Sequence, residues 1–282
     1  DIFKTQQDGL LALCSSFDDL AAAPAFDAVI NLAGAPLAGG HWTEEKKKRL
    51  FASRVGTTEK LVEYLEALPA DQRPRVLVSG SAIGYYGVAI DDGGEDGVTE
   101  KTEPFETTSL SHKMCAQWEA VAMRAEQLGV RVALPRTGIV LGRDGGALSQ
   151  MLFPFEFCLG GKMGSGAHWM PWIHIDDAMG ALALAINDDT LRGPFNLTAP
   201  TPVTNSDFTK ALGAVMGRPT LMTLFAFQLK ALFGKDLATE LLLNGVRVVP
   251  ARLEAAGYKF HHPQLPGALT HLIKAPKESP KC

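Results

Sequence analysis

The sequence predicts an α/β protein built on a doubly wound, parallel β-sheet. Short, continuously apolar runs alternate along the chain with longer segments of helical periodicity, which is typical of buried parallel strands joined by crossover helices. Several of the apolar runs end in glycine, serine or threonine. Since ligands of doubly wound sheets bind at the carboxyl ends of the strands, we expect a nucleotide-binding cleft along those ends.

The first half of the chain contains two predicted strands and the helix between them. The first strand covers Asp27–Asn31 and ends in a glycine turn at Gly34. Thr43 is a suitable N-cap for a helix that runs to about Leu68, with leucines at helical spacing on one face. Arg75–Ser81 is the second buried strand, and it also ends in small polar residues.

The alternation continues beyond a polar loop. Helical periodicity returns over about 111–128 and is followed by a third strand at Val130–Arg136. A helix at about 176–187 leads to a fourth strand at Pro194–Thr198. This order of strands and helices predicts βαβ units with right-handed crossovers.

The pattern changes beyond Pro202, where short helical segments are broken by glycine and proline. This change indicates a smaller, mainly helical C-terminal lobe. We therefore expect residues 1–150, completed by 172–200, to form the nucleotide-binding domain. Residues 151–171 and 201–282 are expected to form the smaller substrate-binding lobe.

Composition excludes several classes of protein. Hydrophobic residues make up 46% and charged residues 21% of the chain, and the formal net charge is −4, so no nucleic-acid partner is expected. The basic run Lys46–Arg49 directly follows two glutamates, which favours a solvated helix face. No apolar run reaches the ~18 residues that a membrane span needs, and no signal peptide is evident at the start.

The cysteines indicate a reducing compartment. Cys14, Cys115, Cys158 and Cys282 are scattered and form no CxxC pair. They fit neither a disulfide framework nor a cysteine-based metal site, so no metal is expected and the location is expected to be cytoplasmic.

The strand ends resemble those of the extended and atypical short-chain dehydrogenase/reductase superfamily. The matching segments are Asn31–Gly34, Val78–Gly87, Arg136–Gly142 and Trp172–Asp177. A narrower resemblance is to its sugar-nucleotide epimerase-like subgroup. That match is carried by Asn31–Pro36, Trp42, Ser53-Arg54, Gly84–Gly87, Pro154-Phe155, Leu159–Gly161, Gly164–Gly166 and Pro171–Asp177. The resemblance implies a Rossmann-type fold, an NADP cofactor with NAD as an alternative, and a small-molecule substrate such as a nucleotide sugar.

The resemblance also implies something about the first strand. In the family, Asp27–Asn31 corresponds to the fourth strand, and the glycine-rich loop that binds the pyrophosphate follows the first. The N-terminal strands and this loop are therefore expected to be absent from the chain. Ala28–Leu32 would then be an exposed strand edge, either unpaired or paired with another chain in a homodimer.

The expected cofactor-binding residues lie at the strand ends and on the helix that follows the first strand. They are Leu32, Ala33, Gly34, Arg54, Ser79, Gly80, Arg136, Thr137 and Val140. By resemblance, Leu32 and Ala33 would approach the cofactor through their backbones, and Val140 would line the nicotinamide end. Arg54 would face the cofactor, with a surface carboxylate as the alternative partner.

The catalytic pair of the superfamily is incomplete. The family uses Tyr-x-x-x-Lys on the helix after its fifth strand, where the lysine helps the phenol to exchange a proton. Lys113 matches the lysine, but Ser109 stands at the tyrosine position, and a serine hydroxyl is far too weak an acid to replace a phenol. Tyr85 or Tyr86 could substitute, although Tyr86 also suits a packing role. The catalytic candidates are Ser81, Tyr85 and Lys113.

Further interpretations concern Ser81, His112 and the pair of His174 with Asp176, and the first two stay open. Ser81 either hydrogen-bonds the substrate or cofactor or only caps its turn. His112 is either an acid or base near neutral pH or a surface histidine. His174 and Asp176 alternate with isoleucine and are interpreted as satisfying each other structurally.

Two functions fit this sequence. The first is an NADP-linked oxidoreductase or epimerase-like enzyme that acts on a nucleotide sugar or related small molecule. The second is a catalytically silent nucleotide-binding or regulatory protein that keeps the dehydrogenase fold. The missing tyrosine of the Tyr-x-x-x-Lys pair favours the second function, whereas the strand ends are compatible with both.

Overall fold

The computed structural model of the chain describes residues 16–20, 25–91, 93–94 and 96–274. Its centre is a parallel sheet in the order β1-β2-β5-β10, with the short strand β3 also paired to β5. These strands are β1 (Ala28–Asn31), β2 (Val76–Ser79), β3 (Ser81–Ala82), β5 (Arg131–Thr137) and β10 (Gly193–Leu197). All four predicted strands are present, and the doubly wound α/β fold is confirmed.

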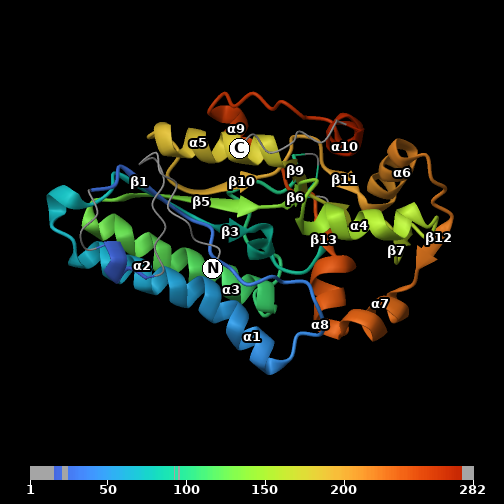
Figure 1. Cartoon of the computed structure of the whole chain (residues 1–282), viewed down its shortest axis with the longest axis horizontal. Helices are drawn as coiled ribbons and strands as arrows, with labels where there is room; N and C mark the ends of the chain where they lie inside the picture. Colours follow the sequence, from blue (N-terminus) through green and yellow to red (C-terminus); the bar gives the residue numbers. More distant parts are fainter. Residues whose placement is uncertain (1–15, 21–24, 92, 95, 275–282) are drawn as a thin grey trace.

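Helices cover both faces of this sheet (Figure 1). On one side lie α1 (Glu44–Phe51), α2 (Thr57–Ala67) and α3 (Leu110–Met123). On the other side lie α5 (Ile175–Asn187) and the short helix α9 (Ala251–Ala255). The apolar strand sequences follow from this arrangement, because each central strand is buried on both faces.

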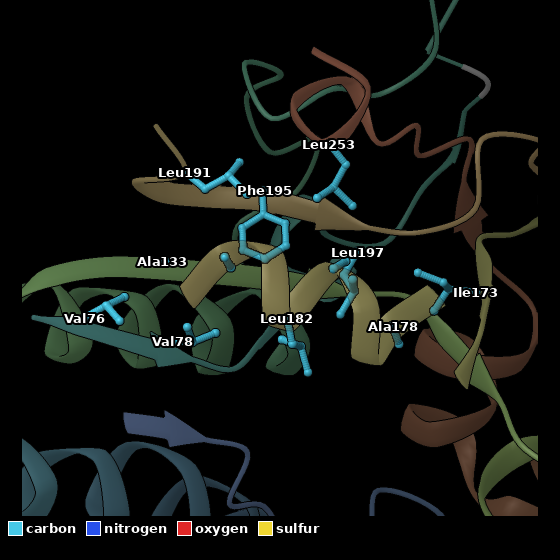
Figure 2. Packing of buried hydrophobic residues seen from close by; sticks show 12 residues of the cluster. Val76, Val78, Ala133, Ile173, Ala178, Leu182, Leu191, Phe195, Leu197 and Leu253 are labelled. Carbon is cyan, nitrogen blue, oxygen red and sulfur yellow. The ribbon is translucent and has the colours of Figure 1, made fainter. Parts of the chain in front are cut away.

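Two hydrophobic clusters fill the space between the sheet and its helices. On the α5 side, Phe195 of β10 packs among Val78, Leu182 and Leu253 (Figure 2). On the other side, leucines of α2 pack against β2, β5 and the end of α3. The core therefore sits on either side of β2 and β5.

The long helix predicted to begin after Thr43 is interrupted. Thr43 caps α1 as expected, accepting a hydrogen bond from the Lys46 N–H at 3.2 Å, but a π-helical turn at Ala52–Gly56 separates α1 from α2. The Ser53 hydroxyl donates to the Leu50 carbonyl at 3.0 Å, and that of Thr58 donates to the Arg54 carbonyl at 2.7 Å. Such side-chain bonds to the helix backbone accompany a widened turn, a feature often found at functional sites.

The first strand is an edge strand in the part of the chain that the structure describes, because β1 pairs with β2 alone. Ile30 is 45% exposed and Leu32 is 57% exposed. This agrees with the predicted exposed edge at Ala28–Leu32. Its pairing with a second chain stays a prediction.

The smaller lobe lies beside the carboxyl ends of the strands (Figure 1). It contains α4 (Gly146–Glu156), α6 (Asn205–Met216), α7 (Ala226–Phe233), α8 (Lys235–Leu237) and a π-helical turn (Ala238–Leu242). The helix α10 (Leu265–Lys274) packs with α4 and α6 around a second core.

Short strand pairs lie outside the main sheet, and one of them joins the loop before α3 to the C-terminal part of the chain. They are β4 (Ile90–Asp91) with β13 (Gly245–Val246), β6 (Ile139–Leu141) with β9 (Trp172–His174), β7 (Gly161–Met163) with β12 (Met222–Leu224), and β8 (Trp169–Met170) with β11 (Val203–Thr204). Within the described ranges, no helix has the length and hydropathy needed to cross a membrane.

Arg131 should be a main stabilising residue of the fold. This buried arginine at the start of β5 donates at 2.9 Å to the carbonyls of Ala185, Ile186 and Leu191, near the end of α5. Arg131→Met leaves these carbonyls without their partner, so we expect the free energy of unfolding to fall by about 3 kcal/mol. Denaturant unfolding measures this change.

The matched control is Arg124→Met, because Arg124 is an exposed arginine with a single 3.9 Å ion pair to Glu66. Its loss should change the free energy of unfolding by less than about 1 kcal/mol. Equal effects of the two substitutions would contradict the role assigned to Arg131.

Candidate functional site

A buried polar network lies where β3 and β5 end. Ser81 donates to Glu119 Oε1 at 2.6 Å, and Arg136 binds the same carboxylate through Nε at 2.8 Å and Nη2 at 2.9 Å. Arg136 Nη1 also donates to the Tyr86 hydroxyl at 3.2 Å, and that hydroxyl donates to Asn196 Oδ1 at 2.7 Å. All five side chains are buried, so the network forms a rigid wall behind the strand ends.

The charges of this network are balanced inside the protein. Burial by itself would lower the pKa of Arg136, but the hydrogen bonds and the charge of Glu119 outweigh burial and raise it. Burial raises the pKa of Tyr86 to about 12, although the nearby Arg136 opposes that shift. Tyr86 therefore stays protonated at neutral pH and acts as a hydrogen-bond donor, which agrees with its packing role.

Local structure brings the members of the network together. Ser81 of β3 lies opposite Arg136 of β5 in the strand register. Glu119 lies on the buried face of α3, whose other members are Ser111, Met114, Cys115, Trp118 and Ala122. Sequence reasoning missed Glu119 and Asn196. An acidic residue within an apolar helical stripe was the available signal for Glu119.

Tyr85 occupies a different position from Tyr86. Its ring lies over the Arg136 guanidinium, with 3.4 Å from the guanidinium carbon to the ring centroid. His112 lies beside it, with its Nδ1 2.5 Å from the Tyr85 carbonyl and the two ring centroids 5.4 Å apart. Tyr85 is only partly buried, whereas Tyr86 is buried. Of these two phenols, a ligand could therefore reach that of Tyr85.

At the start of α3, Ser109 stands where the superfamily has its tyrosine. Ser109 is the N-cap of α3, and its hydroxyl accepts a hydrogen bond from the His112 N–H at 3.3 Å. Lys113, one turn further along, is exposed, whereas Ser81 is buried against Glu119. The predicted catalytic residue Ser81 is therefore a member of the network, Tyr85 packs against it, and Lys113 does not join it.

A cavity of about 310 Å³ lies between the lobe and the segment before α3. It is lined by Val88, Glu106, Lys235, Asp236, Thr239 and Glu240. Glu240 accepts hydrogen bonds from the N–H groups of Leu110 at 3.1 Å and Ser111 at 2.9 Å, where the helix N-terminus favours negative charge. None of the predicted site residues lines this cavity.

Arg54 and Gly34 form the part of the site that best fits an anionic ligand. Arg54 projects from the π-helical turn so closely over Gly34 that a Cβ there would lie 3.0 Å from the guanidinium carbon. Arg54 also donates weak hydrogen bonds of 3.5 Å to the Leu50 carbonyl and the Ser53 hydroxyl, and its guanidinium carbon lies 5.6 Å from the centroid of the Trp118 ring. Burial lowers the pKa of Arg54.

The alternative partner for Arg54 was a surface carboxylate. No acidic side chain in the described part of the chain forms an ion pair with Arg54, in contrast to Arg136, which has Glu119. A partly buried guanidinium without a counter-ion, beside an exposed glycine turn, fits a phosphate group. The residues present are thus compatible with a dinucleotide cofactor at this end of β1.

The remaining predicted cofactor residues divide into two groups. Leu32, Gly34 and the partly buried Ala33, Thr137 and Val140 lie where a ligand could reach them. Ser79 is fully buried and accepts from Asn31 Nδ2 at 3.4 Å. At Gly80 an added Cβ would lie 3.0 Å from the Trp118 ring, so this glycine is required by internal packing.

A second group of polar side chains converges at the start of α5, on the opposite side of the sheet from α3. Its members are His174, Asp176, His262 and His271. His174 Nδ1 accepts a hydrogen bond from the Asp176 N–H at 3.1 Å, so the expected partnership of these two residues is present. Sequence reasoning did not link them to His262 and His271, which lie far along the chain.

Comparison with known proteins bears on both halves of the chain. Residues 10–197 match the family model described as NAD dependent epimerase/dehydratase family, and residues 224–272 match a domain of unknown function, DUF1731. An Arabidopsis thaliana protein named "Epimerase family protein SDR39U1 homolog, chloroplastic" is 38% identical over 247 residues, covering 88% of this chain and 68% of the relative. An epimerase family protein of Mycobacterium tuberculosis is 40% identical over 250 residues, covering 89% and 79%.

Solved structures show the same fold. The crystal structure of human epimerase family protein SDR39U1 (isoform2) with NADPH is similar with a TM-score of 0.82 and 33% identity, over 92% of this chain and 86% of that one. A UDP-glucuronic acid 4-epimerase from Bacillus cereus, in complex with UDP-glucuronic acid and NAD, has a TM-score of 0.69 over 91% and 76% of the two chains. Its 14% identity supports the fold alone.

Glu119 should be essential for the stability of the strand ends. Glu119→Gln keeps the side-chain shape but leaves the buried charge of Arg136 without its carboxylate. We expect the free energy of unfolding to fall by about 3 kcal/mol, measured by denaturant unfolding. Glu126→Gln, an exposed change on the turn after α3, is the control and should have little effect. A loss for Glu119→Gln no larger than the control would contradict the assigned ion pair.

The raised pKa of Tyr86 predicts a loss of stability at alkaline pH. The folded protein holds the phenolic proton until about pH 12, whereas the phenol of an unfolded chain titrates near pH 10. The stabilising contribution is therefore complete below pH ~10 and disappears as pH rises from ~10 to ~12.

The measurement is unfolding of the wild type and of Tyr86→Phe across this range. The variant should be less stable at neutral pH but should lose less stability as pH rises. Tyr258, whose pKa is also raised to about 12 by burial, leaves a residual slope in both proteins. Identical pH slopes would argue against a buried, protonated Tyr86.

Proposed function

The chain belongs to the NAD dependent epimerase/dehydratase family, and we propose that it is an NADP-linked oxidoreductase or epimerase-like enzyme acting on a nucleotide sugar or related small molecule. The observation that carries this proposal is the Arg54–Gly34 pair at the end of β1. It offers an exposed glycine turn and the guanidinium of Arg54, which forms no ion pair with a carboxylate in the described part of the chain. A phosphate of the cofactor would supply the missing counter-charge.

The preference for NADP over NAD rests on one similar protein of known structure. The human epimerase family protein was crystallised with NADPH, and its 33% identity extends over most of this chain. The family description names NAD dependence, so NAD remains the alternative cofactor. The proposed substrate class comes from the family and from the sugar-nucleotide epimerase-like motifs of the sequence.

The bound nicotinamide would supply the hydride chemistry, and this chain's residues would orient the ligand and move a proton. Tyr85 presents a phenol whose ring is held against Arg136, so it is the proposed proton-transfer residue. Ser81 donates a hydrogen bond to Glu119, so its oxygen can still accept a hydrogen bond from substrate or cofactor. Lys113, exposed on α3, would act only at the rim of the site.

A nucleotide-binding protein without turnover is the second candidate function. Ser109 caps α3 at the position where the superfamily has its tyrosine, and the nearby hydroxyls of Ser81 and Tyr86 donate within the network. Tyr85 is therefore the one candidate on which the enzyme hypothesis depends, and the non-catalytic hypothesis holds if Tyr85 transfers no proton. A protein of this fold that binds the dinucleotide through Arg54 and carries out no reaction would have this arrangement.

The domain boundaries, the location and the oligomeric state stay predictions. We propose that the nucleotide is bound by the sheet domain, residues 1–150 completed by 172–200, and the substrate by the smaller lobe. A cytoplasmic location and a homodimer paired through the edge of β1 are likewise predictions. One relative is named as chloroplastic, so location differs within the family.

Arg54→Gln should weaken NADPH binding by about 10- to 100-fold, because it removes a charge-assisted contact to phosphate. The measurement is a fluorescence titration of NADPH into the protein expressed with its complete natural sequence. Arg49→Gln is the control, since Arg49 is exposed on α1, just before the π-helical turn that carries Arg54, and its NADPH affinity should be unchanged. Equal affinities of wild type and Arg54→Gln would contradict the role of Arg54.

Turnover separates the two candidate functions. The same protein is incubated with NADP⁺ or NADPH and candidate nucleotide sugars, while cofactor absorbance and sugar products are followed. Turnover that disappears in Tyr85→Phe supports the enzyme, and binding without any turnover supports the silent protein. Failure to bind either dinucleotide would overturn both.

A further inference from the structure

Three imidazole rings and one carboxylate meet at the surface where α5 begins. His174, Asp176, His262 and His271 each offer a donor atom, and these atoms all lie within 4.8 Å of one another. His174 is buried, whereas the other three are partly or fully accessible. The cluster is therefore open to small solutes on one side and supported by the protein on the other.

The distances around Asp176 are close to those of a metal site. Asp176 Oδ2 lies 3.5 Å from His174 Nδ1 and 3.7 Å from His262 Nε2. Ligand bonds of 2.0–2.1 Å at tetrahedral angles place neighbouring ligand atoms about 3.3 Å apart. Small rotations of the accessible Asp176 and His262 side chains would close the difference.

The fourth member completes the set from a distant helix. His271 of α10 lies with its Nδ1 3.1 Å from His174 Nε2, and its ring is 4.6 Å from that of His262 between centroids. His174 and His262 are stacked at 3.8 Å. One cation could therefore contact a donor atom from each of the three rings.

The backbone around the cluster is held in place independently of the four side chains. The fully buried carboxylate of Asp177 accepts hydrogen bonds from the His261 N–H at 2.7 Å and the His262 N–H at 2.9 Å. Tyr258 also donates to the Asp177 carbonyl at 3.0 Å. These bonds hold the C-terminal segment against the start of α5, so the donors are positioned before any ligand binds.

We propose that His174, Asp176, His262 and His271 bind one divalent transition-metal cation of the zinc type. Three imidazoles and one carboxylate supply nitrogen and oxygen donors, which suit Zn²⁺ and disfavour the all-oxygen preferences of Mg²⁺ and Ca²⁺.

Metal binding would exchange contacts that exist in the free protein. His174 Nδ1 accepts from the Asp176 N–H and its Nε2 faces His271, so coordination by this ring replaces one of the two contacts. In return, the bonds to the cation would link His174 of β9 and Asp176 of α5 to His262 and to His271 of α10. The cation would act as a clamp that holds the C-terminal segment to the sheet domain, which is distinct from the proposed cofactor site on the α3 side.

The test is direct metal binding to the chelator-treated full chain. Isothermal titration with Zn²⁺ should give one site per chain, and Co²⁺ should give the visible absorption of a nitrogen- and oxygen-ligated ion. The midpoint of thermal unfolding should rise by about 5–10 °C when free Zn²⁺ is about a hundredfold above Kd. Mg²⁺ at the same concentrations should have no such effect.

Variants of the accessible members locate the site without disturbing buried His174. His262→Asn, His271→Asn and Asp176→Asn should each weaken Zn²⁺ binding at least about tenfold, which reduces the thermal shift to about half of the wild-type value or less. His261→Asn is the matched control, because His261 is an exposed neighbour outside the cluster, and it should bind Zn²⁺ like the wild type.

Two outcomes would overturn the proposal. One is a wild-type chain that binds no stoichiometric Zn²⁺ or Co²⁺. The other is unchanged affinity in the double variant His262→Asn with His271→Asn, since the cation would then be held elsewhere, for instance by the exposed Cys158.

Discussion

The buried ion pair between Arg136 and Glu119 is the interaction on which the candidate site depends. A guanidinium buried at the end of a central strand is costly unless a carboxylate meets it with good geometry, and Glu119 does so through two hydrogen bonds. The pair joins β5 to α3 and determines where Ser81 and both tyrosines lie. Its charges are satisfied by each other, so the pair holds the strand ends in place and leaves no unpaired charge of its own.

The two arginines near the strand ends differ in this respect. Arg136 is neutralised by Glu119, whereas Arg54 lies over the Gly34 turn with only weak contacts to a carbonyl and a hydroxyl. The π-helical turn that carries Arg54 is stabilised by the hydroxyls of Ser53 and Thr58. One arginine therefore maintains the architecture, and the other supplies positive charge at the expected cofactor end of the sheet.

A second buried carboxylate organises the side of the sheet that α5 covers. Asp177 is fully buried and is satisfied by backbone N–H groups of the C-terminal segment. This requirement draws His262 toward the start of α5, while the packing of α10 on α6 brings His271 to the same place. The histidine cluster is thus a consequence of how a buried carboxylate and an apolar helix are accommodated.

The doubly wound sheet, its four main strands and the Thr43 cap could all be predicted from the amino-acid sequence. These features depend on local periodicity and on backbone freedom, which neighbouring residues reveal. Other features became visible only once the chain was folded: Glu119 pairs with Arg136, Ser79 and Gly80 face inward, Arg54 forms no ion pair with a carboxylate in the described part of the chain, and His174 meets His271, 97 positions away. Those outcomes depend on which buried polar groups find partners across the fold, and spacing along the chain carries no record of that.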